Sequence, residues 1–206
     1  MTEERPNKAL QVTAARTDNL YAVPPDLPVP ADDGACDHLP RLPWPSVALP
    51  STRGRLVSLA AVETDWLVVY FYPRTGLPDQ DPPGGLAAWD SIPGARGCTP
   101  QACSYRDYSS ELIKRGAQVF GVSTQDTAYQ QEVVERLHLP YELLSDSALE
   151  LARALRLPTF SVAGQNLIKR LTLIGRRGRI ETCLYPVFPP NSDAAKVLRY
   201  ITEGAC

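Results

Sequence analysis

One apolar run, WLVVYFY, constrains the fold of this chain more than any other feature of its sequence. It spans Trp66 to Tyr72, consists of aliphatic, β-branched and aromatic residues, and ends at Pro73. A half-exposed strand alternates apolar with polar residues, whereas this run is continuously apolar. We therefore expect a strand that is buried on both faces, in the centre of an α/β sheet.

The rest of the chain alternates between strand patterns and helix patterns. In order, we expect a strand and turn at 55–62, the strand at 66–72, a helix from Thr99-Pro100 to about Gly116, a strand at 117–124, a helix at 126–139, a strand at 141–146, a helix at 147–157, a hairpin at 167–187 and a helix at 193–204. This order predicts the α/β class, with a mixed central β-sheet flanked by helices. The plan resembles the thioredoxin-like fold.

Two segments depart from this alternation. Residues 21–45, YAVPPDLPVPADDGACDHLPRLPWP, favour an extended or polyproline-like conformation. We expect residues 1–38 to be an N-terminal extension and 39–206 to be a single thioredoxin-like domain. Residues 74–97 are dense in Gly, Pro and Asp, which predicts a loop inserted after the central strand, and a loop of that length is usually functional or mobile.

Composition excludes several partner classes. The chain has 206 residues, 44% of them apolar, and a formal net charge of −2, so it can bury one good core. Lys and Arg are spread along the chain, and we therefore expect neither a nucleic acid nor a membrane as partner. The first residues, MTEERPNKALQVTAARTDN, lack the apolar segment of a secretory signal, which favours a cytoplasmic protein.

Cysteine usage points to redox chemistry. The five cysteines are Cys36, Cys98, Cys103, Cys183 and Cys206. An odd number in a chain without an export signal argues against the disulfide framework of a secreted protein. In a reducing compartment, a close pair such as Cys98 and Cys103 is more often catalytic, redox-sensing or metal-binding.

The position of Cys98 favours a reactive thiolate. It comes directly before Thr99-Pro100, and a hydroxyl residue followed by proline is typical of a helix N-cap and first turn. The unpaired N–H groups and the positive end of the helix dipole stabilise a thiolate there. Arg96 is a possible local cation, and Arg170 is one that folding could bring in. We expect Cys98 to be a nucleophile.

Cys103 lies five residues further along the same expected helix. Side chains five residues apart on a helix project about 140° apart, with a rise of about 7.5 Å. A disulfide usually needs Cα atoms within roughly 7 Å of each other. We therefore expect that Cys98 and Cys103 cannot join while the helix is intact, and that a disulfide between them requires the first turns to unwind.

Four motifs together resemble one family. FYP after the buried strand, GCTPQACSYRD at 97–107, GVSTQD at 121–126 and LLSD before a helix match, in order, the pattern of Q-type peroxiredoxins of the bacterioferritin comigratory protein type. The resemblance covers roughly residues 39–205. It implies a thiol peroxidase in which Cys98, the peroxidatic cysteine, reduces hydrogen peroxide or an organic hydroperoxide and becomes a sulfenic acid.

The same resemblance implies the rest of the cycle. Cys103 is then the resolving cysteine, which condenses with the sulfenic acid to a disulfide, and a thioredoxin- or glutaredoxin-like protein reduces that disulfide. No cofactor is implied, and we expect a monomer or weak homodimer. Two other functions stay open: a thiol–disulfide oxidoreductase of thioredoxin type, and a redox sensor without efficient peroxidase turnover.

The chain departs from the family pattern just before Cys98. Q-type enzymes carry P-x-x-x-T-x-x-C, in which the proline shields the pocket and the threonine hydroxyl bonds the thiolate and the peroxide. Here Ala95 stands three residues before Cys98. Either Pro73 and Thr75 fold back over the site, or Pro93 and backbone groups of the loop replace them.

The family also has an active-site arginine on the strand before the late hairpin. Counting back from Gly178 points to Lys169, whereas residue type points to Arg170. Neighbouring side chains face opposite sides of a strand, so only one of the two reaches the pocket. We favour Arg170 because its planar charged group suits two-point contact with sulfur and oxygen. We expect Thr99 and Arg106 to support the site.

The remaining cysteines have simpler interpretations. Cys36 and His38 could form half of a zinc or copper site, but the second half is not evident, so we expect no metal. Cys183 lies in a strand pattern and is most simply a core residue. Cys206, at the end of the sequence, is expected to be exposed.

Overall fold

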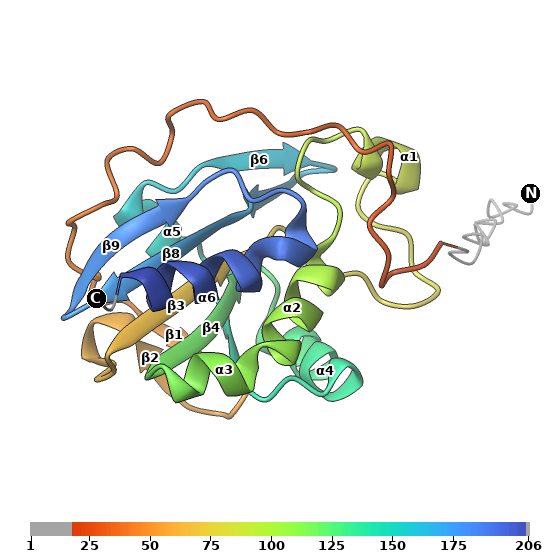
Figure 1. Ribbon diagram of the computed structural model, residues 1–206. Coiled ribbons are helices and arrows are strands. Elements are labelled where there is room, and N and C mark those ends of the chain that lie inside the picture. The colour runs from red at the N-terminus through yellow and green to blue at the C-terminus, as the bar shows by residue number, and fades with distance from the viewer. Residues whose placement is uncertain (1–17, 205–206) are drawn as a thin grey trace, which may run out of the picture.

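The computed structural model describes residues 18–204, which are built around a five-stranded mixed sheet (Figure 1). In spatial order its strands are β5 (Glu142–Ser145), β4 (Ala117–Ser123), β3 (Trp66–Phe71), β8 (Leu171–Arg176) and β9 (Arg179–Leu184). The pairs β3–β4 and β4–β5 are parallel, whereas β8 is antiparallel to both β3 and β9. The predicted α/β class with a mixed central sheet is confirmed.

Two short hairpins lie beside the main sheet. One pairs β1 (Ala48–Pro50) with β2 (Leu56–Ser58), and the other pairs β6 (Thr159–Val162) with β7 (Gln165–Ile168). The helices are α1 (Leu86–Asp90), α2 (Cys98–Asp107), α3 (Ser109–Lys114), α4 (Thr127–Leu137), α5 (Glu150–Leu155) and α6 (Asp193–Glu203), with 3₁₀ turns η1 (Leu59–Ala61) and η2 (Pro190–Ser192). Within residues 18–204, no helix has the length and apolar character needed to span a bilayer.

The central strand is buried on both faces, as its composition predicts. Val68 and Tyr70 pack with α2, α3, α4 and α6 on one face of the sheet. Leu67, Val69 and Phe71 pack on the other face with α5 and the β1–β2 hairpin. Burying both faces of one strand forces helices onto each side of the sheet, and this places the N-terminal end of α2 at the carboxyl end of β3.

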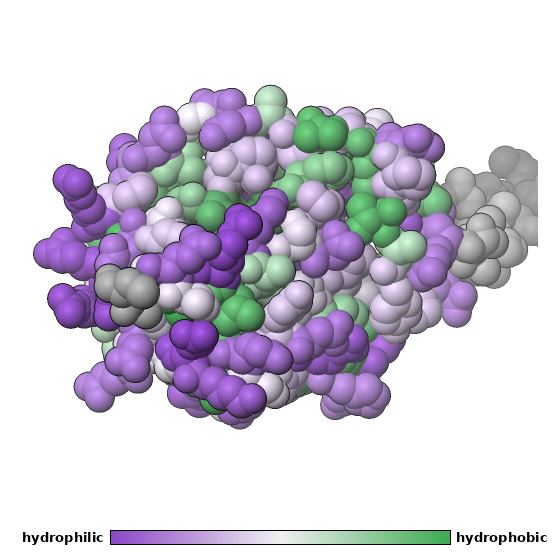
Figure 2. Space-filling model, viewed as in Figure 1, coloured by the Kyte–Doolittle hydropathy of each residue, from purple (hydrophilic) through white to green (hydrophobic). Residues whose placement is uncertain are grey.

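Residues 18–38 contain no helix or strand and run along the body of the molecule (red to orange in Figure 1). The chain then joins the edge of the sheet, where the backbone of residues 41–42 exchanges hydrogen bonds of 2.7 and 2.9 Å with Ile180 of β9. Cys36 and Leu39 are both buried. Figure 2 shows a largely hydrophilic surface on this face, with part of its apolar residues gathered near α1 and the neighbouring 18–38 segment. The boundary between an extension and a domain at residue 38 stays a prediction.

The 74–97 segment and the helix after it differ from the prediction. The segment is not all loop, because it contains the short helix α1. The single helix expected up to Gly116 is two helices, α2 and α3. At Tyr108 the backbone leaves the α region, with φ −93° and ψ 4°, and a new helix begins at Ser109.

The region before the late hairpin also differs. The expected continuous strand is interrupted: β7 ends at Ile168 and β8 begins at Leu171, so Lys169 and Arg170 lie between two strands. The β6–β7 hairpin was not expected. Its turn uses Ala163 and Gly164, both with positive φ, and its strands have only four residues each, too few for a clear pattern.

The start of α2 corrects the predicted N-cap. Gly97, not Thr99, is the N-cap, and its backbone is left-handed with φ 96°. Cys98 is therefore the first residue of the helix. Glycine suits this position because a left-handed backbone is unfavourable for other residues, and because a Cβ here would collide with the ring of Pro190.

We predict that Gly97→Ala lowers the free energy of unfolding by about 1–3 kcal/mol, since it adds both backbone strain and a clash at the start of α2. Chemical denaturation measures the change. Gly54→Ala is the matched control, because Gly54 has φ 72° but no atom within 4 Å of an added Cβ. If Gly97→Ala costs no more than Gly54→Ala, close packing against Pro190 does not constrain this turn.

Candidate active site

Cys98 lies buried at the first turn of α2, with its sulfur against a guanidinium group. Only 3% of the residue is exposed. Its thiol donates to the carbonyl oxygen of Ala95 at 3.6 Å, and Nη2 of Arg170 donates to the Cys98 sulfur at 3.1 Å. A permanently charged donor at this distance and the N-terminal end of a ten-residue helix both place positive charge at the Cys98 sulfur.

Arg170 is held in place by the backbone of the loop that precedes Cys98. Its guanidinium donates to the carbonyl oxygens of Gly94, Ala95 and Arg96, at distances of 3.3, 3.2 and 3.0 Å. Its Nη1 also donates to Oε1 of Gln101. Arg170 is 3% exposed, so these acceptors replace the water that a buried guanidinium needs.

Lys169 is not brought to Cys98. Its Nζ lies 3.0 Å from Oδ2 of Asp33 and 3.3 Å from Oη of Tyr185. The Lys169 ammonium lowers the pKa of Asp33 to about 2, and Asp33 in turn raises the pKa of Lys169. Of the two basic residues at this point of the chain, the structure places Arg170 beside the sulfur.

Behind Arg170 lies a buried carboxylate that sequence analysis did not identify. Oδ2 of Asp193 accepts hydrogen bonds from Gln101 at 2.8 Å, Tyr105 at 2.9 Å and Thr172 at 2.7 Å. Gln101 donates its amide NH₂ to Asp193, and this orientation turns its Oε1 toward Arg170. A chain of contacts therefore runs from Asp193 through Gln101 and Arg170 to the reactive sulfur.

Complete burial raises the pKa of Asp193, although its hydrogen bonds and Arg170 counteract this. A carboxyl group with a higher pKa in the folded than in the unfolded chain binds its proton more readily when folded. Ionisation of Asp193 therefore lowers the free energy of unfolding progressively as the pH rises from about 4. We predict that Asp193→Asn, which keeps an accepting oxygen without the charge, gains stability relative to the unmodified chain as the pH rises. Urea unfolding at several pH values measures this difference, and a difference independent of pH would contradict the assignment.

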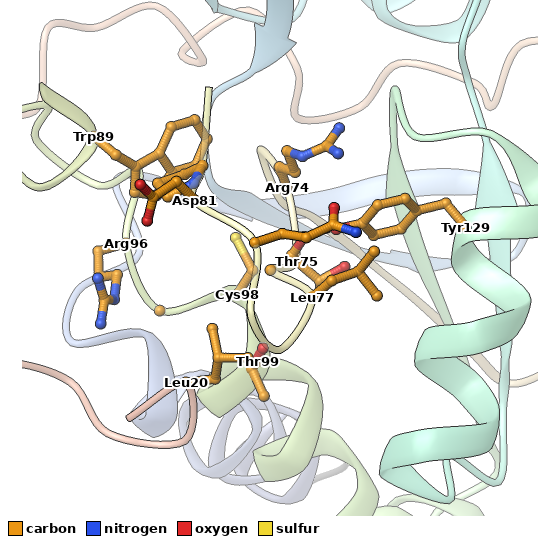
Figure 3. Close-up of a pocket in the computed structure, with 14 residues that line it drawn as sticks. Leu20, Arg74, Thr75, Leu77, Asp81, Trp89, Arg96, Cys98, Thr99 and Tyr129 are labelled. Atoms are coloured by element: carbon orange, nitrogen blue, oxygen red, sulfur yellow. The ribbon is translucent and has the colours of Figure 1, made fainter. Parts of the chain in front are cut away.

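The sulfur of Cys98 faces a small cavity of about 30 Å³ (Figure 3). This volume suits about one water-sized molecule. The residues that line it are Leu20, Arg74, Thr75, Gly76, Leu77, Gln80, Asp81, Pro82, Trp89, Arg96, Gly97, Cys98, Thr99 and Tyr129. Most of them belong to the 74–97 segment, which therefore encloses the sulfur.

Thr75 is one of the hydroxyl residues that the fold brings to this cavity. It is 1% exposed, and its backbone N–H and its hydroxyl both donate to Oε1 of Gln125 at 2.9 Å. The Tyr129 hydroxyl donates to the Thr75 carbonyl at 2.9 Å. Thr75 thus lies at the cavity, whereas the loop group in contact with the Cys98 sulfur is the Ala95 carbonyl, so the choice between the two arrangements that the sequence left open stays a prediction. Pro73 is buried just before it, whereas Pro93 lines a separate cavity next to Arg170.

The other expected site residues lie at different distances from the sulfur. Thr99 is buried and lines the cavity. Arg96 also lines it, but its guanidinium pairs with Asp18 and Asp90. Arg106 lies at the far end of α2, where it bonds the Asp107 carboxylate and the Leu137 carbonyl, at 2.9 and 3.0 Å. It faces Cys103 rather than Cys98.

Cys103 is half-buried on an uninterrupted helix that also carries Cys98, and both are free thiols. Burial raises the pKa of Cys103, which the positive charge of Arg106 partly offsets. Cys103 is therefore protonated near neutral pH.

The structure gives no metal site in the described part of the chain. Among residues 18–204, no three His, Cys, Asp or Glu side chains are grouped so that they could hold a metal ion. His38 instead lies with Nε2 2.9 Å from the Leu155 carbonyl oxygen. Cys206 lies outside the described residues.

Comparisons with known proteins agree with this geometry. Residues 41–198 match the family model described as Redoxin. The chain is 27% identical over 160 residues to the chloroplastic peroxiredoxin Q of Gentiana triflora, covering 78% of this chain and 65% of that protein. It is 31% identical over 102 residues to a putative peroxiredoxin bcp of Coxiella burnetii, covering 50% and 56% of the two chains. The match thus spans 65% and 56% of the length of these two curated relatives, less than two thirds of each.

Solved structures show the same fold. Peroxidoxin BcpB from Mycobacterium tuberculosis superposes with a TM-score of 0.64 at 22% identity, over 81% of this chain and 98% of that one. Xanthomonas campestris peroxiredoxin Q gives a TM-score of 0.60 at 23% identity, over 88% and 99%. The match of residues 41–198 shows that the chain belongs to the Redoxin family, and within that family it is similar to Q-type peroxiredoxins.

Proposed function

We propose that this protein is a thiol-dependent peroxidase that reduces hydrogen peroxide and organic hydroperoxides. The observation that carries the proposal is the contact between the Cys98 sulfur and Arg170 at the start of α2, beside a small cavity that Thr75 also lines. Together these groups supply a nucleophilic sulfur, a fixed positive charge and a hydroxyl group around a space of water size.

In the first step, the Cys98 thiolate attacks the terminal oxygen of the hydroperoxide. A sulfur–oxygen bond forms and the oxygen–oxygen bond breaks, which leaves Cys98 as a sulfenic acid. The departing oxygen takes up the proton that the thiol has lost and leaves as water or an alcohol. Arg170 stabilises the negative charge, first on sulfur and then on the departing oxygen, without having to reorganise.

In the second step, we propose that the Cys103 sulfur attacks the sulfenic sulfur of Cys98, which forms a disulfide and releases water. The first turns of α2 must open for this step, because the helix is intact between the two residues. Two features of α2 support such opening. Its N-cap is a glycine without a side-chain cap, and the break at Tyr108 separates it from α3.

We propose that a thioredoxin- or glutaredoxin-like dithiol protein returns both cysteines to the thiol form, so that the cycle is of the atypical 2-Cys type without a cofactor. A cytoplasmic location and a monomeric or weakly dimeric state are further proposals from the sequence. Cell fractionation tests the first, and size-exclusion chromatography tests the second.

Consumption of hydrogen peroxide by the purified chain with a thiol reductant tests the proposed function. We expect repeated turnover with dithiothreitol, and with thioredoxin, thioredoxin reductase and NADPH. Reduction of a model disulfide without peroxide consumption would favour the thioredoxin-type oxidoreductase instead. A single oxidation without turnover would favour a redox sensor.

A further inference from the structure

A second pair of thiols meets on the opposite face of the sheet from Cys98. Cys36, in the segment before the core, and Cys183, on β9, line the same cavity of about 280 Å³. Cys36 is 4% exposed and Cys183 is half-buried, and both are free. Both belong to the core cluster of α5 and the β1–β2 hairpin, whereas Cys98 belongs to that of α2, α4 and α6.

The backbone fixes this juxtaposition from both sides. Beyond Cys36, residues 41–42 are hydrogen-bonded to Ile180, so the chain runs antiparallel beside β9. Before Cys36, Asp33 pairs with Lys169 at 3.0 Å. Cys36 therefore lies between two anchors that hold it against the end of β9.

The two thiols also interact with each other. The neighbouring Cys36 sulfur raises the pKa of Cys183, and burial and the negative charge of Asp32 raise it further. Cys183 thus keeps its proton near neutral pH, and a thiol reacts with peroxide far more slowly than a thiolate. Cys183 therefore reacts slowly when peroxide is scarce.

We propose that Cys36 and Cys183 form a second redox site, which closes to a disulfide when hydroperoxide is in excess and ties the 18–38 segment to β9. One of the two sulfurs attacks the hydroperoxide, displaces water or an alcohol, and becomes a sulfenic acid. The other sulfur then attacks it, a sulfur–sulfur bond forms, and water leaves. One hydroperoxide is reduced for each pair of thiols oxidised.

This disulfide acts on a segment that reaches the active site. Asp18 pairs with Arg96, and Leu20 lines the cavity of Cys98. A covalent link at Cys36 closes a loop of well over a hundred residues, and links of that length stabilise a folded chain mainly by restricting the unfolded one. We expect oxidation of this pair to raise Tm by about 5–10 °C.

The test uses the full chain with Cys98→Ser, Cys103→Ser and Cys206→Ser, in which Cys36 and Cys183 are the remaining cysteines. The variant is treated with excess hydrogen peroxide and its free thiols are alkylated. The intact protein and its peptides are then analysed by mass spectrometry. We expect a monomer that has lost two hydrogen atoms, a peptide joining Cys36 to Cys183, and reversal by dithiothreitol. Because this variant lacks Cys98, the result is independent of the proposed peroxidase cycle.

The matched control adds Cys183→Ser to the same variant. It should form no intramolecular disulfide and should show no rise in Tm after oxidation. The proposal is overturned if both thiols of the test variant remain open to alkylation, if Cys36 is oxidised to a sulfinic acid while Cys183 stays reduced, or if the disulfides join separate molecules.

Discussion

Replacing Arg170 with lysine lowers the second-order rate constant for peroxide reduction by about 10²–10³-fold. The guanidinium contacts the Cys98 sulfur through Nη2 and also binds Gln101 and the carbonyl oxygens of the loop before Cys98. A lysine keeps the charge but offers a single nitrogen, which cannot hold these acceptors and the sulfur at once. The loss is expected in the chemical step, because Arg170 stabilises charge that develops as the oxygen–oxygen bond breaks.

Stopped-flow measurement of Cys98 oxidation, with circular dichroism to verify folding, tests this prediction. Lys169→Ala is the matched control, since Lys169 is adjacent in sequence but pairs with Asp33 outside the site. We expect its rate constant to stay within about twofold of the unmodified chain. A larger effect at Lys169 than at Arg170 would reverse the assignment of the active-site cation.

Cys98→Ser abolishes peroxide turnover, whereas Cys103→Ser permits one oxidation and then stalls. A serine hydroxyl is not ionised near neutral pH, so the first variant has no nucleophile for the oxygen–oxygen bond. The second variant keeps the Cys98–Arg170 contact but has no thiol on α2 to resolve the sulfenic acid. Peroxide consumption over many equivalents, combined with a sulfenic-acid probe, separates the two outcomes.

Cys183→Ser serves as the control for the loss of a partly buried thiol outside this site. It should retain the turnover of the unmodified chain at low peroxide. Full activity in Cys98→Ser would show that another cysteine attacks the peroxide, and undiminished turnover in Cys103→Ser would show that Cys98 is resolved by a different thiol.

The central fold could be predicted because a few strong patterns determine it. WLVVYFY is apolar on both faces and was expected at the centre of the sheet, where β3 lies. Asp126 marks the start of α4, since its carboxylate accepts the Tyr129 N–H at 2.7 Å. Patterns of this kind depend on local sequence and on burial alone.

Elements with weaker local sequence signals could not be predicted. The β6–β7 hairpin has short strands, and their exposed residues do not distinguish strand from loop. The break between α2 and α3 falls at Tyr108, a residue type that gives no helix-stop signal. The sequence predicts Thr99 as the N-cap because of its hydroxyl. The structure places Gly97 there, since a Cβ at this position would collide with the ring of Pro190. This contact joins segments that are far apart in sequence, so local patterns do not reveal it.

The site was predictable where the chemistry is local and not where it depends on long-range contacts. Cys98 could be identified from the helix start beside it. The placement of Thr75 depends on Gln125, fifty residues away. Gln101 and Asp193 are ninety-two residues apart. In the sequence, Gln101 reads as a residue near the start of a helix and Asp193 as an acidic residue at a helix start, so neither is singled out as part of the site. Only the folded chain brings such pairs together.

The most direct test of the proposed peroxidase is a mass spectrum of the reduced, full-length chain after one equivalent of hydrogen peroxide. With free thiols blocked and the protein digested, we expect a peptide that joins Cys98 to Cys103, with Cys36 and Cys183 still alkylated. Oxidation at any other cysteine while Cys98 remains alkylated would contradict the assignment of Cys98 as the thiol that attacks the peroxide.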